Sequence, residues 1–579
     1  MAEVTECFER RTPEMRYSNW EIGSFDRDTA VDFCRNGINP LVSVFLASRG
    51  ITEIKDVQAV TADTFGLFYD PFLMTDMNKA VTRIKKAVNS GERIAIYGDY
   101  DVDGMTSSAT LAVWLESKEA DFEIYIPGRF DEGYGLNNTA LDTLKSKGVS
   151  LVITVDCGIT AIDEARYAKS IGLDLVITDH HECRDVLPEA IAVVDPKRPD
   201  CNYPYKSLAG VGIAFKLINA LEDDYLSDDI FNMYSEFVAI GTVADVMPVI
   251  GENRELIKRG LAVLNTNPRP GLRSLLREVN IDSGKVTASA IGYTIAPRLN
   301  AAGRMGQSGL SVDLLLTGDS AEAERLAVEL CRLNSERRNL EQEIYEEAEA
   351  MLSETIPDKP LILAKHGWYQ GVTGIIAAKM AERYKLPVII ISIDDDGIGR
   401  GSCRSSGSFA LYEALCSCED ILSNFGGHEM AAGVTLEEKN IETLRQRITD
   451  YYQKSIKTAP EPGLKLDFEV EKPELLTIEN IEALERLEPF GNGNPSPCLC
   501  ILGAMLSSAQ SIGSGKHSKL KVEKSGINLD CVFFSVPATE LGVSEGDLVD
   551  LAFEPQVNEF RGRTTVQLQL FDIRASLKT

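Results

Sequence analysis

The sequence lacks the features that mark a secreted, membrane-spanning or disulfide-stapled protein. It has no apolar run of about 18 residues, so we predict no membrane-spanning helix. Its first residues, MAEVTECFERRTPEM, lack the apolar core of a signal peptide, and we expect a cytoplasmic protein. The 12 cysteines include no CxxC pair, which favours reduced, mostly buried thiols over disulfides or a zinc site.

Basic residues and histidines are also scarce. The chain has 59 Lys and Arg against 88 Asp and Glu, for a formal net charge of −29. This balance argues against nucleic-acid binding by bulk electrostatic attraction, although it permits a local basic channel and a metal-bound acidic site. Of the five histidines, His180 and His181 are adjacent, which is unexpected in so histidine-poor a chain.

The length of 579 residues is too great for one hydrophobic core and suggests three or four domains. From about residue 90 to 200, short runs rich in Ile and Val alternate with amphipathic helical stretches. This alternation predicts a parallel sheet covered by helices. The predicted strands are Arg93–Tyr97, Phe122–Ile126, Leu151–Val155, Leu173–Thr178 and Ile191–Val194.

The rest of the chain divides into three further parts. Residues 200–315 are predicted to be mostly helical, and Ser320–Glu354 to form one long helix that connects two lobes. A second α/β unit follows, with strands at Leu361–Ala364 and Val388–Ser392. After the Pro-rich linker Thr458–Gly463, many short β-rich segments predict an all-β barrel of the OB-fold type.

Three aspartates follow the first predicted strand in the string GDYDVDG. Asp99, Asp101 and Asp103 alternate along the chain, so an extended backbone would point them in the same direction. Convergent carboxylates repel one another unless cations lie between them, and hard divalent ions prefer oxygen ligands. The alternative is an Asp-rich turn that caps a helix.

Two more predicted strands end in acidic or imidazole side chains. Asp156 in VDCG follows one strand, and Asp179-His180-His181 follows the next. A single strand-end aspartate is more often a helix cap than a ligand. Three such ends meet at the carboxyl edge of one sheet, where α/β proteins bind ligands. Asp245, in GTVADVMP after an apolar helical stretch, is the fourth candidate.

The Asp-His-His triplet after a strand, with GDYDVDG and VDCG upstream, resembles the DHH phosphoesterase superfamily. Further strings are similar, in the same order, to motifs of the RecJ exonuclease family: IPGRFDEGYGLN, GTVADVMP, APRLNAAGR, GVTGIIAAK, GSCRS, FGGHEMAAG and LEPFGNGNP. The resemblance runs from about residue 20 to the C-terminus. One departure is Cys403, which occupies a position that is often alanine in the GSxRS loop.

The resemblance implies two divalent cations, Mn²⁺ or Mg²⁺, held by carboxylate and imidazole ligands. The expected ligands are Asp101, Asp103, Asp156, His180 and Asp245. It also implies three residues that act beside the metals. Asp99 would support the ligands, His181 would contact a phosphate, and His428 would line the cleft near the scissile phosphate; the alternative for His428 is a histidine of the core.

The resemblance further implies a pocket for a terminal 5′-phosphate. The residues expected there are Arg129, Arg298, Ser402 and Arg404; for each arginine, the alternative is a surface ion pair. The C-terminal barrel is expected to hold single strands with a basic groove and stacking aromatics. A local basic run suits that role, although it would equally suit a solvated hairpin: Lys516, His517, Lys519 and Lys521.

The implied fold is an α/β protein in which a parallel-sheet DHH domain is joined by a long helix to a second α/β domain, followed by an OB-fold barrel. The expected parts are an N-terminal helical segment packing on the DHH domain (1–85), the DHH domain (86–315), the connecting helix (316–356), the DHH-associated domain (357–457) and the OB-fold (464–579).

The implied function is hydrolysis of single-stranded DNA from the 5′ end by a two-metal mechanism, in DNA repair and recombination. We expect a monomer that binds single-stranded DNA, with a helicase or a single-strand-binding protein as the candidate protein partner. Two rival functions remain: a DHH-family phosphatase or oligonucleotide hydrolase, and a non-enzymatic replication scaffold. The retained ligand set argues against the scaffold, and the additional barrel argues against a small-substrate phosphatase.

Overall fold

The computed structural model forms two compact units. One comprises 66–459 with Gly491–Gly493, and the other comprises Met1–Phe65, Pro460–Phe490 and Asn494–Thr579. The residues that the structure describes are 17, 19–61, 68–129, 135–222, 226–281, 284–352, 358–405, 409–427, 429–455, 463–560 and 562–576.

The first domain contains the predicted parallel sheet. Its five strands are ordered β3 (Phe122–Tyr125), β2 (Ile94–Gly98), β4 (Leu151–Val155), β5 (Asp174–Thr178) and β6 (Ala192–Val194), and all neighbours are parallel. Every residue of β2 and β4 is buried, as their continuous apolar sequences require. The five predicted strands are therefore confirmed, with ends that shift by one residue.

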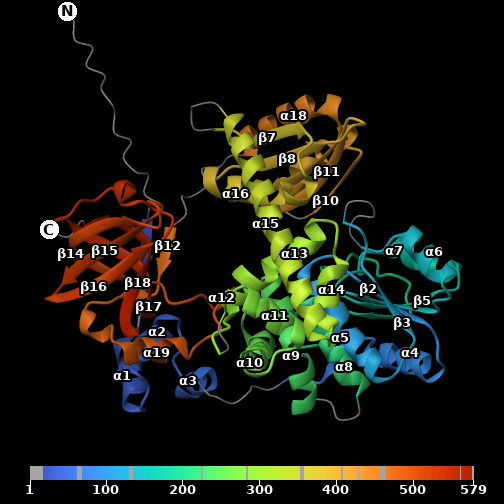
Figure 1. The fold of residues 1–579 in the computed structure, drawn as a ribbon, viewed down its shortest axis with the longest axis horizontal. Coiled ribbons are helices and arrows are strands. Elements are labelled where there is room, and N and C mark those ends of the chain that lie inside the picture. Colours follow the sequence, from blue (N-terminus) through green and yellow to red (C-terminus); the bar gives the residue numbers. More distant parts are fainter. Residues whose placement is uncertain are drawn as a thin grey trace, which may run out of the picture. The chain divides into compact units, whose positions relative to one another are not determined.

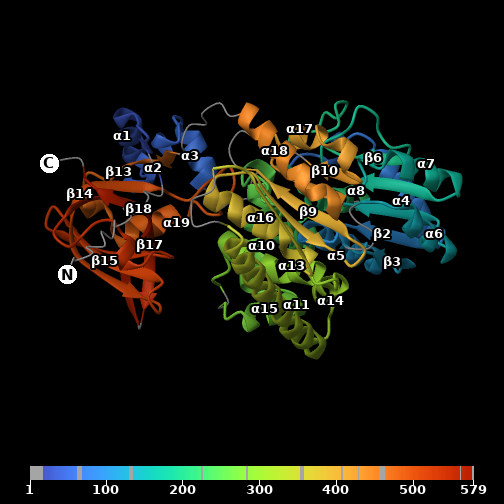
Figure 2. The same cartoon turned by 90° about the horizontal axis from the view of Figure 1, so that it is seen from above.

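Helices cover both faces of this sheet (Figure 1, Figure 2). On one face, the core joins the strands to α4 (Met77–Asn89), α5 (Val102–Ser117) and α8 (Gly210–Leu221). On the other face lie α6 (Asn138–Ser146) and α7 (Ile162–Ser170). Because both faces are covered, only the carboxyl edge of the sheet is left to receive a ligand.

The predicted helical region is confirmed. It contains α9 (Asp228–Ala244), α10 (Gly251–Thr266), α11 (Pro270–Glu278), α12 (Ala288–Ala290), a π-helical turn (Ile291–Ile295), α13 (Ala296–Arg304) and α14 (Gly309–Leu316).

The long helix α15 (Ser320–Ala350) follows, with 31 residues and a length of about 46 Å. Asp319 caps it by accepting a hydrogen bond from the Glu322 N–H. Figure 1 shows α15 running from α13 and α14 to the second sheet, where it packs against α16 (Gln370–Tyr384).

The second α/β domain has a mixed sheet of five strands. Their order is β10 (Asn424–Gly427), β11 (Ala431–Glu437), β9 (Ile398–Arg404), β8 (Val388–Ile393) and β7 (Leu361–His366). Only β7 and β8 are parallel; the remaining pairs are antiparallel. Helix α16 covers one face and α17 (Leu411–Cys416) with α18 (Ile441–Ser455) covers the other.

The other unit contains the predicted OB-type barrel. The strands β14 (Leu499–Ile512), β15 (His517–Lys524), β16 (Ile527–Phe533), β18 (Arg563–Ala575) and β17 (Leu548–Phe560) pair in that order, and pairing of β14 with β17 closes the barrel. A short strand β13 (Phe468–Glu469) adds to β14. Of the predicted linker Thr458–Gly463, residues 458–462 lie outside the described residues, and Gly463 begins β12 (Gly463–Leu466).

The segment 1–85, expected to pack as a whole on the first domain, is divided between the two units. The helices α1 (Arg27–Arg35), α2 (Pro40–Ser48) and α3 (Ile54–Thr61) belong to the barrel unit, and α4 packs on the parallel sheet. Strand β1 (Asn19–Ile22) pairs with β12, more than 400 residues away.

Side chains explain why the N-terminal helices pack there. Phe33 and Phe45 share a core with Phe468 of β13 and Phe553 of β17. The Trp20 indole N–H donates to Asp572 at 2.9 Å. Local helical periodicity predicts that these helices are amphipathic, but it does not say which distant surface they cover.

Two absences hold within the described part of the chain. No helix there is long and apolar enough to cross a membrane. All 11 cysteines in the described ranges are free thiols, and most are partly or fully buried.

Phe33→Ala should destabilise the barrel unit by about 3–5 kcal/mol, because it removes a ring with 1% exposure from the core shared with β13 and β17. Differential scanning calorimetry of the whole protein measures the change. Val31→Ala on the same helix is the control, since Val31 is 45% exposed and should have little effect. Equal effects of the two changes would contradict this packing.

Candidate active site

The first part of the site is the turn between β2 and α5. Asp99 directly follows β2, Asp101 caps α5, and Asp103 lies in the first helical turn. The Asp101 carboxylate accepts hydrogen bonds from the backbone N–H groups of Asp103 at 2.9 Å and Gly104 at 3.1 Å. The predicted extended backbone is therefore wrong: the aspartates converge because a strand, a tight turn and a helix follow one another.

Two glycines allow the backbone to pack this closely. A Cβ atom on Gly104 would lie 2.5 Å from the backbone N and O of Asp99. On Gly210, at the start of α8, a Cβ would lie 2.6 Å from the Asp156 side chain. Any larger residue would push the carboxylates apart.

Asp103 is fixed by the N-terminus of α8. Its two carboxylate oxygens accept the N–H groups of Gly210 at 2.7 Å and Val211 at 2.8 Å. The positive end of the helix dipole stabilises a carboxylate in this position. One aspartate of the cluster is therefore held rigidly before any ligand binds.

Asp156, His180 and Asp245 complete the cluster with Asp103. The Nε2 atom of His180 lies 3.0 Å from Asp156 Oδ1, 3.6 Å from Asp245 Oδ2 and 3.8 Å from Asp103 Oδ2. Asp156 follows β4, His180 follows β5, and Asp245 ends α9. The structure thus brings together side chains that are up to 142 residues apart in sequence.

The carboxylates of the cluster oppose one another's ionisation. Burial, followed by repulsion from neighbouring aspartates, raises the pKa values of Asp99, Asp103 and Asp156 well above the usual range. The same causes raise the pKa of Asp245 to about 7. An arrangement that disfavours its own charge in this way is suited to bind cations.

His180 differs from His181 in its charge state. Burial lowers the pKa of His180 to about 3, so its imidazole is neutral at pH 7 and can act as a ligand. Burial also opposes the charging of His181, but the hydrogen bond to Asp179 outweighs it and raises the pKa of His181 to about 9. His181 is therefore a cation at the edge of the cluster.

Asp179 is a functional residue to which the sequence assigned no role. Its carboxylate lies 2.7 Å from His181 Nδ1 and accepts the N–H groups of His180 at 2.7 Å and Ile159 at 2.8 Å. Burial opposes its ionisation, but these hydrogen bonds, led by that of His181, hold the pKa of Asp179 below its usual value. It orients and charges His181, and its place as first letter of the Asp-His-His triplet was the available signal.

Three overlapping groups of side chains have the geometry to hold metal ions. Within each group the candidate ligand atoms lie within 4.8 Å of one another. The buried Asp156 Oδ1 accepts no hydrogen bond from any described residue, so a lone pair is available to a cation. The residues present therefore fit divalent cations. The groups are Asp99–Asp101–Asp156, Asp103–His180–Asp245 and Asp156–His180–His181.

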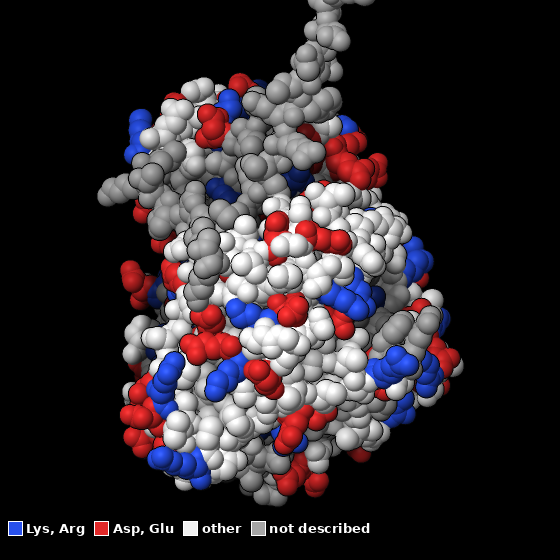
Figure 3. Space-filling view, turned by 90° about the vertical axis from the view of Figure 1, so that its left-hand side faces the viewer, with Lys and Arg blue, Asp and Glu red and all other residues white. Residues whose placement is uncertain are grey.

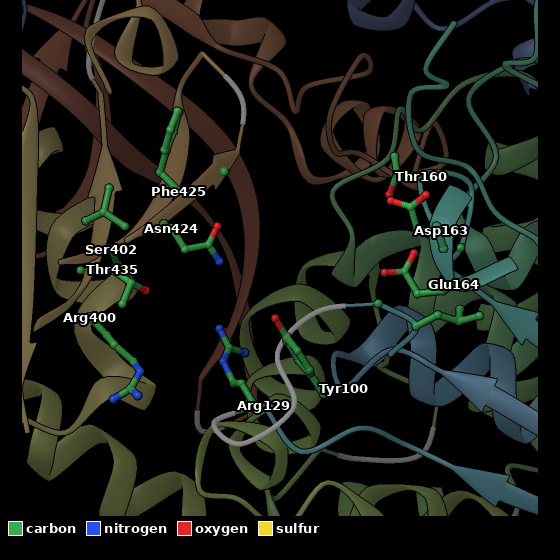
Figure 4. A pocket seen from close by; sticks show the side chains of 18 of the residues that line it. Tyr100, Arg129, Thr160, Asp163, Glu164, Arg400, Ser402, Asn424, Phe425 and Thr435 are labelled. Atoms are coloured by element: carbon green, nitrogen blue, oxygen red, sulfur yellow. The ribbon is translucent and has the colours of Figure 1, made fainter. Parts of the chain in front are cut away.

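A cavity of about 920 Å³ lies between the first sheet and the second sheet of the same unit, and its lining includes Tyr100, the residue between Asp99 and Asp101 (Figure 4). On one side it is lined by Tyr100 and Arg129, and on the other by Arg400 and Ser402. Asp163 and Glu164, in the first turn of α7, face them across the cavity. We call the part lined by Arg129 and Arg400 the cationic wall, and the part lined by Asp163 and Glu164 the anionic wall.

Arginines gather around the cationic wall. The Arg129 guanidinium lies over the Tyr100 ring at 4.6 Å. Burial, then repulsion from Arg129, lowers the pKa of Arg404. Burial, followed by the charges of Arg129, Arg337 and Arg404, lowers the pKa of Arg304 to about 10. Guanidinium groups held close enough to lower one another's pKa values are suited to bind an anion.

Arg304 is a cation near this wall to which the sequence assigned no role; it lies six residues after Arg298 in APRLNAAGR. Arg298 donates to the Thr294 carbonyl at 2.7 Å and lies against Cys331. Its charge also acts on Arg337, a neighbour of Arg304, and its expected place at the 5′-phosphate stays a prediction.

His428 lies outside the described residues, so its expected place in the cleft stays a prediction. Cys157, next to Asp156, is a buried thiol whose pKa burial raises well above its usual value, so it is poorly suited to act as a nucleophile.

Comparison with known proteins defines the class first. Residues 93–242 match the N-terminal domain of the DHH family, 358–454 match the DHHA1 domain, and 466–572 match the RecJ OB domain. A parallel sheet with a carboxylate and imidazole edge, joined by a helix to a DHHA1 domain, is thus the architecture of a DHH-type phosphoesterase.

Relatives then define the family. The single-stranded-DNA-specific exonuclease RecJ of Bacillus subtilis is 40% identical over 564 residues, covering 96% of this chain and 71% of its own length. Its Escherichia coli counterpart is 34% identical, covering 92% and 96%. The crystal structure of RecJ in complex with Mn²⁺ from Thermus thermophilus superposes with a TM-score of 0.80 at 28% identity, covering 96% of this chain and 79% of that one. The chain belongs to the RecJ family.

In the presence of a chelator, Asp156→Asn should raise the melting temperature by about 2–4 °C, or roughly 1 kcal/mol, because the amide removes one repelling buried carboxylate. Mn²⁺ should stabilise the wild type much more than the variant. Asp121→Asn, at an exposed aspartate just before β3, is the control and should leave both melting temperatures unchanged. A variant that melts lower than the wild type in chelator would contradict the account of the cluster.

Proposed function

We propose that this protein is a metal-dependent exonuclease that degrades single-stranded DNA from the 5′ end. The observation that carries the proposal is the cluster around Asp156, in the same unit as a cavity that Arg129 and Arg400 line. The relatives named as single-stranded-DNA-specific exonucleases span most of the chain, including the barrel.

The proposed metal ligands are the five residues expected from the sequence together with Asp99, which lies in one of the three groups. The structures of Thermus thermophilus RecJ in complex with Mn²⁺ and with Mg²⁺ support these ions as cofactors. Bound there, divalent cations would polarise the phosphoryl oxygens and lower the pKa of the attacking water. The ligands are Asp99, Asp101, Asp103, Asp156, His180 and Asp245.

His181 has the chemistry to act on the substrate directly. Its imidazolium, charged through Asp179, can donate a hydrogen bond to a non-bridging oxygen of the scissile phosphate. It can thereby neutralise the charge that develops during hydrolysis. The proposed role for His428 is beside it, at the same cleft.

The 5′-phosphate is proposed to bind at the cationic wall. Arg129 and Ser402 line the cavity, and the Ser402 hydroxyl lies 2.9 Å from the Thr373 hydroxyl in the first turn of α16. That helix begins at Gln370, another lining residue. Its first turn lies beside Arg304 and Arg404, and the positive end of a helix dipole next to two guanidinium groups suits a phosphate.

The cavity has the size of a pocket for one small ligand, so it suits the terminal nucleotide of a single strand better than a duplex end. On the barrel, Lys519 and Lys521 are exposed on β15, and the His517 ring packs against the exposed ring of Phe534. This pairing of basic and aromatic groups supports the proposed strand-binding surface.

Binding must be local, because overall charge opposes it. On the face in Figure 3, described Lys and Arg side chains are interspersed with Asp and Glu. The free cysteines of the described ranges suit the proposed reducing, cytoplasmic location. A helicase or single-strand-binding partner and a role in repair and recombination stay predictions. A small-substrate phosphatase would leave the barrel without a role.

The test is degradation of a labelled single-stranded oligonucleotide with Mn²⁺ and with a chelator. We expect activity only with the metal, and at least a thousandfold loss for Asp156→Asn, on the order of other ligand losses at metal centres. The control variant Asp121→Asn, at an exposed aspartate just before β3, should remain active. Activity in chelator, or near wild-type activity of Asp156→Asn, would contradict the proposed function.

Arg404→Ala should slow degradation of 5′-phosphorylated strands by about tenfold to hundredfold, since it removes a charge-assisted contact to the dianionic phosphate. Strands with a 5′-hydroxyl should be much less affected, so the preference between the two substrates shrinks. Arg447→Ala in the same domain is the control, because Arg447 pairs with Asp420 on the surface. A variant with the wild-type phosphate preference would place Arg404 outside the end-binding pocket.

A further inference from the structure

Asp245 occupies a position that its own helix does not favour. It is the C-terminal cap of α9, where the negative end of the helix dipole meets its carboxylate. The side chain is only partly buried, and its Oδ2 atom lies 3.6 Å from His180 Nε2. The end of α9 therefore does not itself hold the Asp245 carboxylate in the position that metal binding requires.

The next residue is strained. Val246 has φ +56° and lies in the left-handed position that follows a helix, which is usually glycine. For a β-branched side chain this conformation is a genuine outlier, and Val246 is also 66% exposed, so its side chain gains little from packing. Such strain persists only where neighbouring groups hold the backbone.

The loop Gly491-Asn492-Gly493 holds this backbone from the distant LEPFGNGNP motif. The Asn492 side-chain amide donates to the Val246 carbonyl at 2.8 Å, and the Val249 N–H donates to the Asn492 carbonyl at 2.7 Å. The fit is close: a Cβ on Gly491 would lie 2.6 Å from Val249 Cγ2. Residues 491–493 belong to the compact unit of the metal centre, whereas the residues on either side of them belong to the barrel unit.

We propose that Asn492 is a positioning residue for Asp245 and thereby sets the affinity of the centre for divalent cations. The proposal rests on the proposed function, because it takes Asp245 as a metal ligand. Asn492 contacts neither metal nor substrate. It fixes the strained backbone immediately after the ligand, so that the carboxylate is held in place before the ion binds.

If Asn492 positions Asp245, the C-terminal part of the chain contributes to metal binding as well as to DNA binding. A protein cut before residue 464 loses Asn492 together with the barrel, although every proposed metal ligand precedes the cut. Such a truncated chain should bind Mn²⁺ more weakly as well as binding DNA more weakly.

The test measures Mn²⁺ binding directly, by isothermal titration calorimetry or by electron paramagnetic resonance of free Mn²⁺, in the full-length protein. Asn492→Ala should weaken Mn²⁺ binding by about three- to tenfold, as expected for the loss of one hydrogen bond that supports a ligand. Turnover on single-stranded DNA should fall at limiting Mn²⁺ and recover at saturating Mn²⁺. Asn492→Gln, which keeps an amide donor, should restore part of the affinity.

Asn36→Ala is the matched control, because the exposed Asn36 amide likewise donates to a backbone carbonyl, that of Asp32 at 2.9 Å, in the barrel unit. It should leave Mn²⁺ binding unchanged. Gly491→Ala is the second variant, since its methyl group would displace Val249 without altering Asn492; it too should weaken Mn²⁺ binding.

The outcomes separate this proposal from the proposed function. If the wild type binds Mn²⁺ and degrades DNA while both variants bind Mn²⁺ as tightly, Asn492 does not position Asp245 and the function stands. A lower melting temperature with unchanged Mn²⁺ affinity likewise overturns the proposal, since it marks a merely structural loop. If the wild type neither binds Mn²⁺ nor degrades DNA, the proposed function itself fails.

Discussion

The carboxyl edge of the first sheet concentrates five aspartates and two histidines in a space where several of them are buried. Desolvation and mutual repulsion oppose the charge of these carboxylates, and only cations can offset both costs together. The rest of the fold follows from the need to hold such a cluster. Glycine at 104 and 210 lets the backbone approach, and the N-terminus of α8 neutralises part of Asp103.

The supports of the cluster come from different distances along the chain. Asp101 and Asp103 are held by hydrogen bonds within a turn and by α8, about 100 residues away. His181 is set by its immediate neighbour Asp179. Asp245 is last in sequence and least favoured by its own helix, and the backbone after it is fixed by a loop about 250 residues further on. The weaker the local support for a ligand, the more the site depends on a distant contact.

The arginines near the cationic wall have the opposite requirement from the carboxylate cluster, because they are stabilised by an anion. Arg304 and Arg404 are partly buried near Arg129, and burial together with the neighbouring guanidinium charges lowers their pKa values. The carboxylate cluster, these arginines and the cavity that Arg129 lines all belong to one unit. A cluster suited to cations and a group suited to an anion can thus bind a charged ligand locally, despite the net charge of −29.

Sequence by itself determined the strands of the first sheet and the candidate ligands at its edge. Strand periodicity located β2 to β6, and the strings GDYDVDG, VDCG and Asp-His-His named the side chains at their ends, because strand-end residues of a parallel sheet must share an edge. Tertiary structure alone decided the pairings that no local pattern encodes. These are the packing of α1 to α3 on the barrel, the approach of Arg304 to Arg129 and Arg404, and the contact of Asn492 with the backbone after Asp245. Periodicity reports which face of an element is apolar or charged, but the partner of that face is chosen by the packing of the whole chain.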